Sequence, residues 1–262
     1  MRRLATALLL LAGTCWIGTA FASAQTTPTA TLASEQQMKL FYQQGIARVK
    51  GGWVLSGTNA IARVDDKFRA KVTVNPAIPT EWRVKGYNHV GDIDVVGDFV
   101  YAPWEQSDYT RGEQVTARYR AKTLKFVDAT VVAQHENSFV TVDPKTKILY
   151  SFDNFGGDAF FRYDLRKGFA PLPPLAMSAF VDKVQGADVR GGAIWLSTTD
   201  PNNGLYRVDL KTGVVDALGS AGHPGGEGEG IDATPLRSGQ LHTLTVDAAG
   251  APIWLGHFRV TG

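Results

Sequence analysis

The sequence has a single cysteine, Cys15, among its 262 residues, so the chain has no internal disulfide. Several enzyme fingerprints are also missing. There is no G-x-S-x-G elbow, no H-E-x-x-H, no P-loop and no G-x-G-x-x-G dinucleotide motif. These absences argue against α/β serine hydrolases, zincins and nucleotide-binding enzymes. No helical periodicity of useful length follows residue 44, which argues against an α/β fold.

Residues 1–24 have the features of a secretory signal peptide. Arg2 and Arg3 form a basic region, an apolar run extends from Leu4 to Phe21, and residues 22–24 form an A-x-A cleavage site. An uncleaved membrane anchor is the alternative, because about 18 apolar or small residues could span a bilayer. We favour cleavage, which predicts a secreted or periplasmic protein without a membrane attachment.

Cleavage would also leave a chain without an excess of either charge. Arg2 and Arg3 are two of the 27 basic residues and residues 1–24 contain no acidic residue, so 25 basic residues would face 25 acidic ones. Proteins that bind nucleic acid or anionic membranes favour a basic surface. We therefore expect no nucleic-acid or membrane partner, and we expect a monomer.

One short pattern recurs five times. A polar residue and a glycine open a brief apolar strand, a turn follows, and a second strand is rich in aromatic and β-branched residues. The openings fall at residues 44, 91, 137, 185 and 229, at intervals of 47, 46, 48 and 44. Such periods are typical of solenoids and propellers. Each repeat also carries one arginine further on: Arg63, Arg118, Arg162, Arg207 and Arg259.

A fourth run with strand character ends each of the first four repeats, at residues 69–74, 126–132, 171–177 and 214–218. About four antiparallel strands in each of five units predict an all-β fold, a five-bladed β-propeller formed by residues 44–262 as one domain. The fifth unit ends at Gly262 without a fourth strand. We expect residues 25–43 to be a leader that contains a candidate closing strand for that blade.

The loops between blades and those that join second to third strands share one face of a propeller, the mouth of its channel. Those loops are the longer ones here, and loops on a rigid scaffold often carry function. The sequence places Trp104, Glu105 and Tyr109 in one of them, where the aromatic rings could stack on a ligand; simple loop packing is the alternative.

The channel openings provide a second group of candidates, which are polar side chains around one axis. They are Gln44, His89, Asp92, Asn137, Gln185 and Glu229. Oxygen ligands suit Ca²⁺ or Mg²⁺, and His89 would suit a transition metal. Glu229, Asn137, His89 and Asp92 are the candidate metal ligands, with Ca²⁺ as the expected ion and no organic cofactor. Gln44 and Gln185 could instead bind a sugar-like ligand, or all six could satisfy channel waters and backbone groups.

Repetition also identifies residues with structural roles. Asp94, Asp188 and Asp232 occupy matching places in three repeats, which predicts a shared structural hydrogen bond. The five arginines are expected to be structural as well, and one arrangement we consider is pairing with an acid of the next blade.

The Gln-Gly and Glu-Gly-Ile-Asp openings, the glycine turns and the Leu-Tyr-Arg-Val-Asp-Leu-Lys-Thr-Gly run at 205–213 resemble β-propellers of the NHL, YVTN and gluconolactonase-like groups. The gluconolactonase-like resemblance implies a divalent metal held in the channel by a Glu at one blade opening, with Asn and Asp from others. Glu229 and Asn137 match that in kind, but that group has six blades. Arabinanase-like propellers place carboxylates at the openings, and Gln44 at the first opening disfavours a glycosidase.

The leading hypothesis is an extracytoplasmic propeller that binds a small-molecule or glycan ligand at the channel mouth, with or without a divalent metal. A metal-dependent, lactonase-like hydrolase is one alternative. A structural or protein-interaction propeller is the other.

Overall fold

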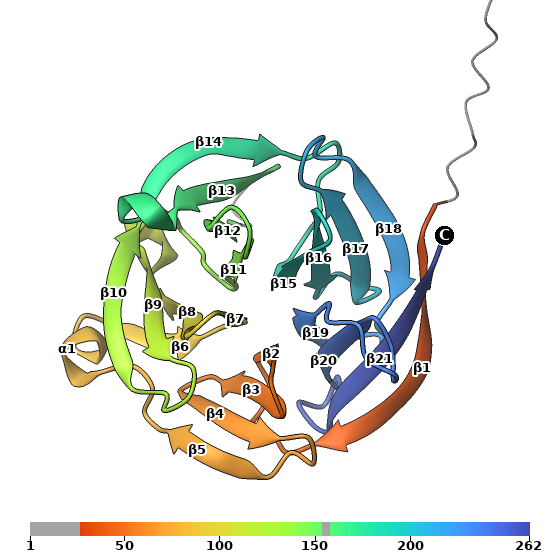
Figure 1. Ribbon diagram of the computed structural model, residues 1–262, viewed down its shortest axis with the longest axis horizontal. Coiled ribbons are helices and arrows are strands. Elements are labelled where there is room, and N and C mark those ends of the chain that lie inside the picture. The colour runs from red at the N-terminus through yellow and green to blue at the C-terminus, as the bar shows by residue number, and fades with distance from the viewer. Residues whose placement is uncertain (1–26, 154–157) are drawn as a thin grey trace, which may run out of the picture.

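The computed structural model describes residues 27–153 and 158–262, which form five antiparallel sheets arranged in a ring (Figure 1). The predicted five-bladed β-propeller is confirmed. The predicted signal peptide lies outside the described residues. Among the described residues, none of the helices is long and apolar enough to cross a membrane.

The blades are numbered in chain order by their innermost strands. Blade 1 consists of β2 (Gly45–Val49), β3 (Gly52–Gly57), β4 (Ala60–Asp65) and β5 (Ala70–Val74). Blade 2 consists of β6 (Tyr87–Val90), β7 (Asp94–Val96), β8 (Phe99–Gln106), β9 (Gln114–Arg120) and β10 (Phe126–Val132). Blade 3 consists of β11 (Thr141–Val142), β12 (Ile148–Ser151), β13 (Ala159–Asp164) and β14 (Ala170–Ala176).

Blade 4 consists of β15 (Val184–Arg190), β16 (Ala193–Thr198), β17 (Gly204–Asp209) and β18 (Val215–Ser220). Blade 5 consists of β19 (Glu227–Asp232), β20 (Leu241–Val246), β21 (Ile253–Thr261) and, from the other end of the chain, β1 (Thr29–Met38). The helical elements are one turn each: α1 (Thr80–Arg83), η1 (Tyr109–Arg111) and η2 (Leu165–Lys167).

Strand β1 completes blade 5 by pairing antiparallel with β21. The register runs from Thr29 opposite Thr261 to Met38 opposite Ile253, with one irregularity between Leu32 and Ser34. The pairing joins the two ends of the described chain into one blade (Figure 1). It covers the backbone groups that β21 would otherwise expose as a sheet edge.

The fourth strands lie where the sequence predicts them, at β5, β10, β14 and β18. Each is the outermost strand of its blade and pairs on one side only. Strand β14 contains three prolines, Pro171, Pro173 and Pro174. An edge strand tolerates them because the lost N–H groups face solvent rather than a neighbouring strand.

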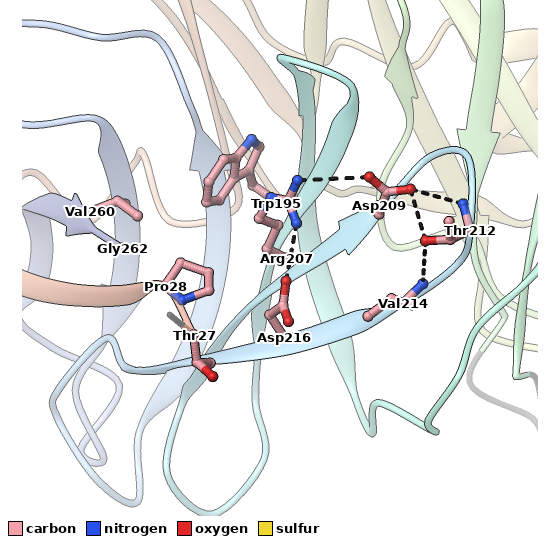
Figure 2. A pocket seen from close by; sticks show the side chains of 10 residues that line it. All are labelled: Thr27, Pro28, Trp195, Arg207, Asp209, Thr212, Val214, Asp216, Val260 and Gly262. Atoms are coloured by element: carbon pink, nitrogen blue, oxygen red, sulfur yellow. Dashed lines mark hydrogen bonds and ion pairs between the residues drawn. The ribbon is translucent and has the colours of Figure 1, made fainter. Parts of the chain in front are cut away.

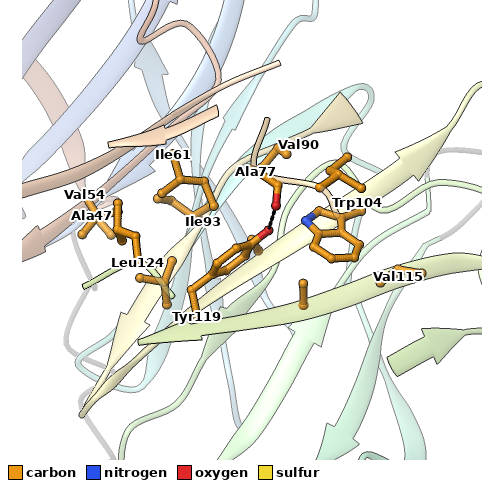
Figure 3. Close-up of a cluster of buried hydrophobic side chains, with 14 of the residues drawn as sticks. Ala47, Val54, Ile61, Ala77, Val90, Ile93, Trp104, Val115, Tyr119 and Leu124 are labelled. Carbon is orange, nitrogen blue, oxygen red and sulfur yellow. Dashed lines mark hydrogen bonds between the residues drawn. The ribbon is translucent and has the colours of Figure 1, made fainter. Parts of the chain in front are cut away.

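The hydrophobic core consists of five clusters, one between each pair of neighbouring blades. In the cluster between blades 1 and 2, Trp104 and Tyr119 are fully buried, and the Tyr119 hydroxyl donates to the carbonyl oxygen of Ala77 at 3.0 Å (Figure 3). Burial of large aromatic side chains is the main stabilising contribution at such contacts.

Side chains of the first strands also tie neighbouring blades together by hydrogen bonds at four of the five junctions. Asp94 accepts from Val142 N at 2.7 Å, Asp188 from Ala233 N at 2.7 Å, and Asp232 from Arg48 N at 2.6 Å. Thr141 takes the equivalent place in blade 3 and accepts from Val189 N at 2.8 Å. The predicted structural role of the three aspartates is confirmed, and the bond that reaches Arg48 crosses from the last blade to the first.

Two of the repeated arginines pair with acids of their own blades. Arg118 donates to Asp128 of β10 at 2.7 Å, and Arg207 donates to Asp216 of β18 at 3.0 Å. Pairing with an acid of the next blade was therefore the wrong arrangement for these two. The fourth strand lies directly beside the arginine-bearing third strand, so its acid is the nearer partner.

Candidate functional site

Five of the residues predicted from the channel mouth form one chain of hydrogen bonds. Gln44 donates from Nε2 to Glu229 Oε1 at 3.2 Å, and its Oε1 lies 2.6 Å from His89 Nε2. His89 Nδ1 lies 3.0 Å from Glu105 Oε2. The other Glu105 oxygen, Oε1, accepts from the backbone N–H of Asn137 at 2.6 Å. Side chains from blades 5, 1 and 2 and the backbone of blade 3 therefore meet at one place.

His89 and Glu105 are directly opposite each other on β6 and β8. Side chains of such a cross-strand pair lie on the same face of the sheet and within contact distance. The His89 side chain is 29% exposed, whereas that of Glu105 is 4% exposed. Both ring nitrogens of His89 face oxygen acceptors, so the imidazole is held rigidly with one part open to solvent.

Glu229 is the buried end of this chain. Burial raises the pKa of its carboxyl well above the usual range, the nearby Glu227 carboxyl raises it further, and the Gln44 hydrogen bond acts in the opposite direction. A neutral carboxylic acid is therefore favoured at this end of the chain, and such a group can donate as well as accept a hydrogen bond.

Tyr109 lies in η1 beside the same cluster. Burial, followed by the charges of Glu105 and Glu136, raises the pKa of its hydroxyl to about 12. The hydroxyl is therefore a neutral donor at physiological pH. Its backbone carbonyl oxygen lies 2.7 Å from His135 Nδ1. The sequence placed Tyr109 near Glu105, and the structure keeps them together.

The expectation for Trp104 is wrong. Strand β8 continues through this residue to Gln106, so Trp104 is not in a loop, and its side chain is fully buried. Its ring lies 5.8 Å from Trp82, 6.2 Å from Tyr119 and 5.7 Å from Phe126, between centroids. A ring enclosed in this way packs the core between blades 1 and 2 and is not available to stack on a ligand.

Asp92 lies at the axis and joins the blades. Its Oδ1 accepts from Ile46 N at 3.0 Å and Ile93 N at 2.9 Å, and its Oδ2 accepts from Ala187 N at 3.0 Å and Ile231 N at 3.3 Å. Burial raises the pKa of the carboxyl well above its usual range, while the four N–H donors lower it. Both oxygens are thus used by the protein.

The glycines of the repeated openings make room for this carboxylate. A Cβ added at Gly186 would lie 2.8 Å from Asp92 Oδ2, and one added at Gly230 would lie 2.7 Å from Asp92 Oδ1. These contacts are too short for any larger residue. The polar-glycine opening is thus explained at Gly186 and Gly230 by the close approach of blades 4 and 5 to Asp92.

Asn137 is fully buried at the opening of blade 3. Its Nδ2 donates to Val115 O at 2.8 Å, and its Oδ1 accepts from the Ser151 hydroxyl at 2.6 Å. Gln185, at the opening of blade 4, is half-buried and lies outside the hydrogen-bond chain described above. The structure therefore brings Gln44, His89, Glu105, Asn137 and Glu229 together and leaves Gln185 apart from them.

The four candidate metal ligands do not fit a common coordination sphere. His89 uses both nitrogens within the chain, Asp92 uses both oxygens on backbone N–H groups, and the Asn137 side-chain oxygen is taken by Ser151. Glu229 accepts from Gln44 and also contacts the Glu227 carboxyl. Across residues 27–153 and 158–262, no group of three His, Cys, Asp or Glu side chains could hold a metal ion.

Sequence reasoning missed the serines that anchor this site. Ser56, Ser151 and Ser197 stand near the ends of the second strands of blades 1, 3 and 4, and each donates its hydroxyl toward a channel opening, to Gly91 O, Asn137 Oδ1 and Glu229 O. Their common place in three repeats was the available signal. Two histidines of blade 5, His242 and His257, were also missed.

A larger cavity lies away from this site, between the outer parts of blades 4 and 5. Its volume is about 770 Å³, and its lining includes Trp195, Arg207, Asp209 and Asp216, with Thr27 and Gly262 near the chain ends (Figure 2). Arg207 contacts both acids, at 3.0 Å from Asp216 and 3.8 Å from Asp209. The Arg207 charge is compensated within its own blade, so we do not place a binding site in this cavity.

No protein-family profile matches the chain, and no curated protein sequence matches it significantly. Among solved structures, a luciferin-regenerating enzyme is similar over 82% of this chain and 75% of its own, with 12% identity and a TM-score of 0.55. A gluconolactonase from Xanthomonas campestris is similar over 90% of this chain and 96% of its own, with 14% identity and a TM-score of 0.50. At such identities the likeness shows the fold alone. The resemblance to gluconolactonase-like propellers is confirmed at the level of the propeller fold.

Proposed function

We propose that the protein binds a small, hydroxyl-rich ligand, such as a sugar or glycan end, at the channel mouth. The observation that carries this proposal is the partly exposed His89 side chain, fixed by Gln44 on one side and Glu105 on the other. Preorganised polar groups reduce the entropy lost on binding, and hydroxyl groups can both donate to and accept from such a chain.

The buried part of the chain supplies the partners that a hydroxyl needs. The neutral acid favoured at Glu229 can donate, the Glu105 carboxylate can accept, and the Tyr109 hydroxyl is close enough to Glu105 for its charge to raise the Tyr109 pKa. Asp92 holds blades 1, 2, 4 and 5 together at the axis, and three of these, blades 1, 2 and 5, carry Gln44, His89, Glu105 and Glu229. The site therefore rests on rigid strands rather than on long loops.

Binding is tested by calorimetry with monosaccharides, disaccharides and sugar lactones. We expect one class to bind the wild type and His89→Asn to weaken that binding about tenfold, because the shorter side chain cannot hold Gln44 and Glu105 in place for the ligand. His223→Asn is the matched control, because His223 has a side-chain exposure of 19% and pairs with Glu35 of β1, the outermost strand of blade 5. Equal affinity of wild type and His89→Asn for the bound sugar would reject the site.

A second candidate function is hydrolysis of a sugar lactone. The directly opposed His89 and Glu105 favour it, since a carboxylate that orients an imidazole is a common arrangement for a general base. In this reaction the substrate and its water would displace Gln44 Oε1, which lies 2.6 Å from His89 Nε2. The gluconolactonase among the similar structures makes sugar lactones the first substrates to test. Release of acid would be followed at constant pH with wild type, Glu105→Gln and chelator-treated protein; turnover that equals the spontaneous rate would reject hydrolysis.

We also propose an extracytoplasmic location, with cleavage after Ala24, on the basis of the N-terminal sequence. N-terminal sequencing of the exported protein tests it. A mature chain that begins at Gln25 supports the proposal, and an uncleaved chain retained in the membrane fraction rejects it.

A further inference from the structure

Two histidines contact each other on the outer part of blade 5. His242 on β20 and His257 on β21 are directly opposite in the register. Their Nδ1 atoms are 2.6 Å apart, and their ring centroids are 4.9 Å apart with the planes at 73°. His242 is fully buried and packs edge-on against Trp53, whereas His257 is half-buried. Such a short contact between two like side chains requires one nitrogen to donate and the other to accept.

The backbone decides which histidine donates. His242 Nε2 lies 2.8 Å from the carbonyl oxygen of Thr234, which can only accept, so this nitrogen carries the proton. In a neutral imidazole the other nitrogen is then an acceptor, so His242 Nδ1 accepts and His257 Nδ1 donates. The remaining nitrogen, His257 Nε2, has an unshared electron pair. Within the described residues it makes no hydrogen bond.

Burial supports this neutral pair. It lowers the pKa of His242, and it lowers the pKa of His257 to about 4, with His242 as a further cause. Asp232 favours the charged form of His242 and Arg48 disfavours it. At physiological pH both rings are therefore neutral and His257 Nε2 remains an acceptor.

His257 lines a cavity of about 360 Å³ between blades 5 and 1. The turns that border it, including residues 66–69 and 233–240, belong to the face opposite the channel mouth. Within the described residues, 233–240 is the longest turn of that face, and it supplies Leu236, Arg237 and Ser238 to the lining. The volume lies in the range of small-molecule sites.

The cavity has an excess of one positive charge. Arg48 pairs with Asp66 at 2.7 Å and also lies over the Trp53 ring, 4.8 Å from its centroid. The charges of Arg48 and Asp66 therefore cancel. Arg237, by contrast, is exposed and makes no ion pair among the residues that the structure describes. One uncompensated guanidinium and one uncharged nitrogen acceptor therefore line the same cavity.

We propose that this cavity is a second binding site, which takes a small carboxylate that bears a neighbouring hydroxyl group. The carboxylate pairs with Arg237, because a guanidinium matches a carboxylate with two parallel hydrogen bonds. The hydroxyl donates to His257 Nε2, which His242 and the Thr234 carbonyl keep free to accept. The site is independent of the channel mouth and uses none of its residues.

The proton assignment is tested first, by nitrogen-15 NMR of the histidine side chains in the full mature protein at pH 7. We expect His257 in the Nδ1–H form and His242 in the Nε2–H form. The reverse assignment for His257, or a doubly protonated His257, would overturn the proposal, because no acceptor would then face the ligand.

The ligand chemistry is tested with glycolate, acetate and glycolamide, which carry both groups, the carboxylate alone and the hydroxyl alone. We expect glycolate to bind at least about tenfold more tightly than either of the others, which corresponds to one good hydrogen bond or ion pair. It should also shift the His257 Nε2 resonance. Equal binding of acetate and glycolate, or no binding of glycolate, would overturn the proposal.

Two variants locate the binding. Arg237→Gln changes an exposed side chain, so the fold should survive, and glycolate affinity should fall about tenfold or more. Arg83→Gln on α1 is the matched control, and it should leave the affinity unchanged. Glycolate binding that survives Arg237→Gln unchanged would overturn the proposal.

Discussion

The Asp92 carboxylate accepts a hydrogen bond from Ala187 N at 3.0 Å, between residues 95 positions apart in the chain. Asp92→Asn replaces one of two oxygens by an amide nitrogen, which cannot accept from backbone N–H groups. Two N–H groups at the axis would lose their acceptor. We expect the free energy of unfolding to fall by about 2–5 kcal/mol, measured by urea denaturation.

Asp98→Asn is the control for this prediction, because Asp98 is exposed in the turn between β7 and β8. It should change the free energy of unfolding by no more than about 0.5 kcal/mol. If Asp92→Asn were equally neutral, the carboxylate would not be the group that holds the blades together, and its role as a metal ligand would have to be considered again.

Trp104→Ala should reduce the stability of the fold, and this should be its main effect rather than a loss of ligand binding. The side chain is fully buried among Trp82, Tyr119 and Phe126, so its removal leaves a large cavity. We expect a loss of about 3–5 kcal/mol in the free energy of unfolding. Tyr109→Phe, which removes only a hydroxyl from a half-buried residue, should leave stability within about 1 kcal/mol. A stable Trp104→Ala protein with lost ligand affinity would instead restore the stacking interpretation.

The buried position of Trp104 could not be predicted from the sequence. A proline removes a hydrogen bond from an internal strand, so Pro103 is an unusual residue in the middle of β8. In the structure, Val90 pairs with Trp104 and Asp94 pairs with Tyr101, so Pro103 lies opposite the break between β6 and β7. No N–H is needed there, and β8 continues to Gln106. The break contains Asp92, which the repeat placed at a channel opening, but its bonds to backbone N–H groups of blades 1, 4 and 5 have no local pattern.

The repeat could be recognised in the sequence because equivalent positions in the blades have the same structural surroundings and therefore similar residues. Asp94, Asp188 and Asp232 could be identified as structural for that reason, and so could the fourth strands. The contact between His89 and Glu105 could not, because it depends on the register of β6 and β8 beyond the break. The candidate site depends on such departures from the repeat, so its geometry could be identified only in the structure.

Removal of β1 should abolish cooperative folding. A chain that begins at Lys39 would leave the outer edge of β21 unpaired and would remove Met38 from the cluster between blades 5 and 1. We expect no cooperative thermal transition by circular dichroism, whereas a chain that begins at Thr27 should melt as the full mature protein does. A synthetic peptide of residues 27–42 should restore the transition to the truncated chain. An unchanged melting temperature after truncation at Lys39 would show that blade 5 closes without β1.

The pH dependence of stability should differ in sign between His257 and Asp94. Burial lowers the pKa of His257 to about 4, so between about pH 4 and 6.5 the unfolded chain binds a proton that the folded chain does not. The free energy of unfolding therefore falls as the pH falls through this range. His257→Gln should remove that dependence, which we expect to amount to about 1–2 kcal/mol between pH 7 and 4.5, since solvent screens a half-exposed ring.

Asp94 provides the opposite case in nearly the same pH range. Burial raises the pKa of its carboxyl to about 6, so between about pH 4 and 6 the folded chain binds the extra proton, and stability falls as the pH rises. As the pH rises, Asp94→Asn should therefore become more stable relative to the wild type. Over the same rise in pH, His257→Gln should become less stable relative to the wild type. Urea titrations of the three proteins at several pH values measure both. Parallel curves for all three would show that neither group has a pKa that differs between the folded and unfolded chains.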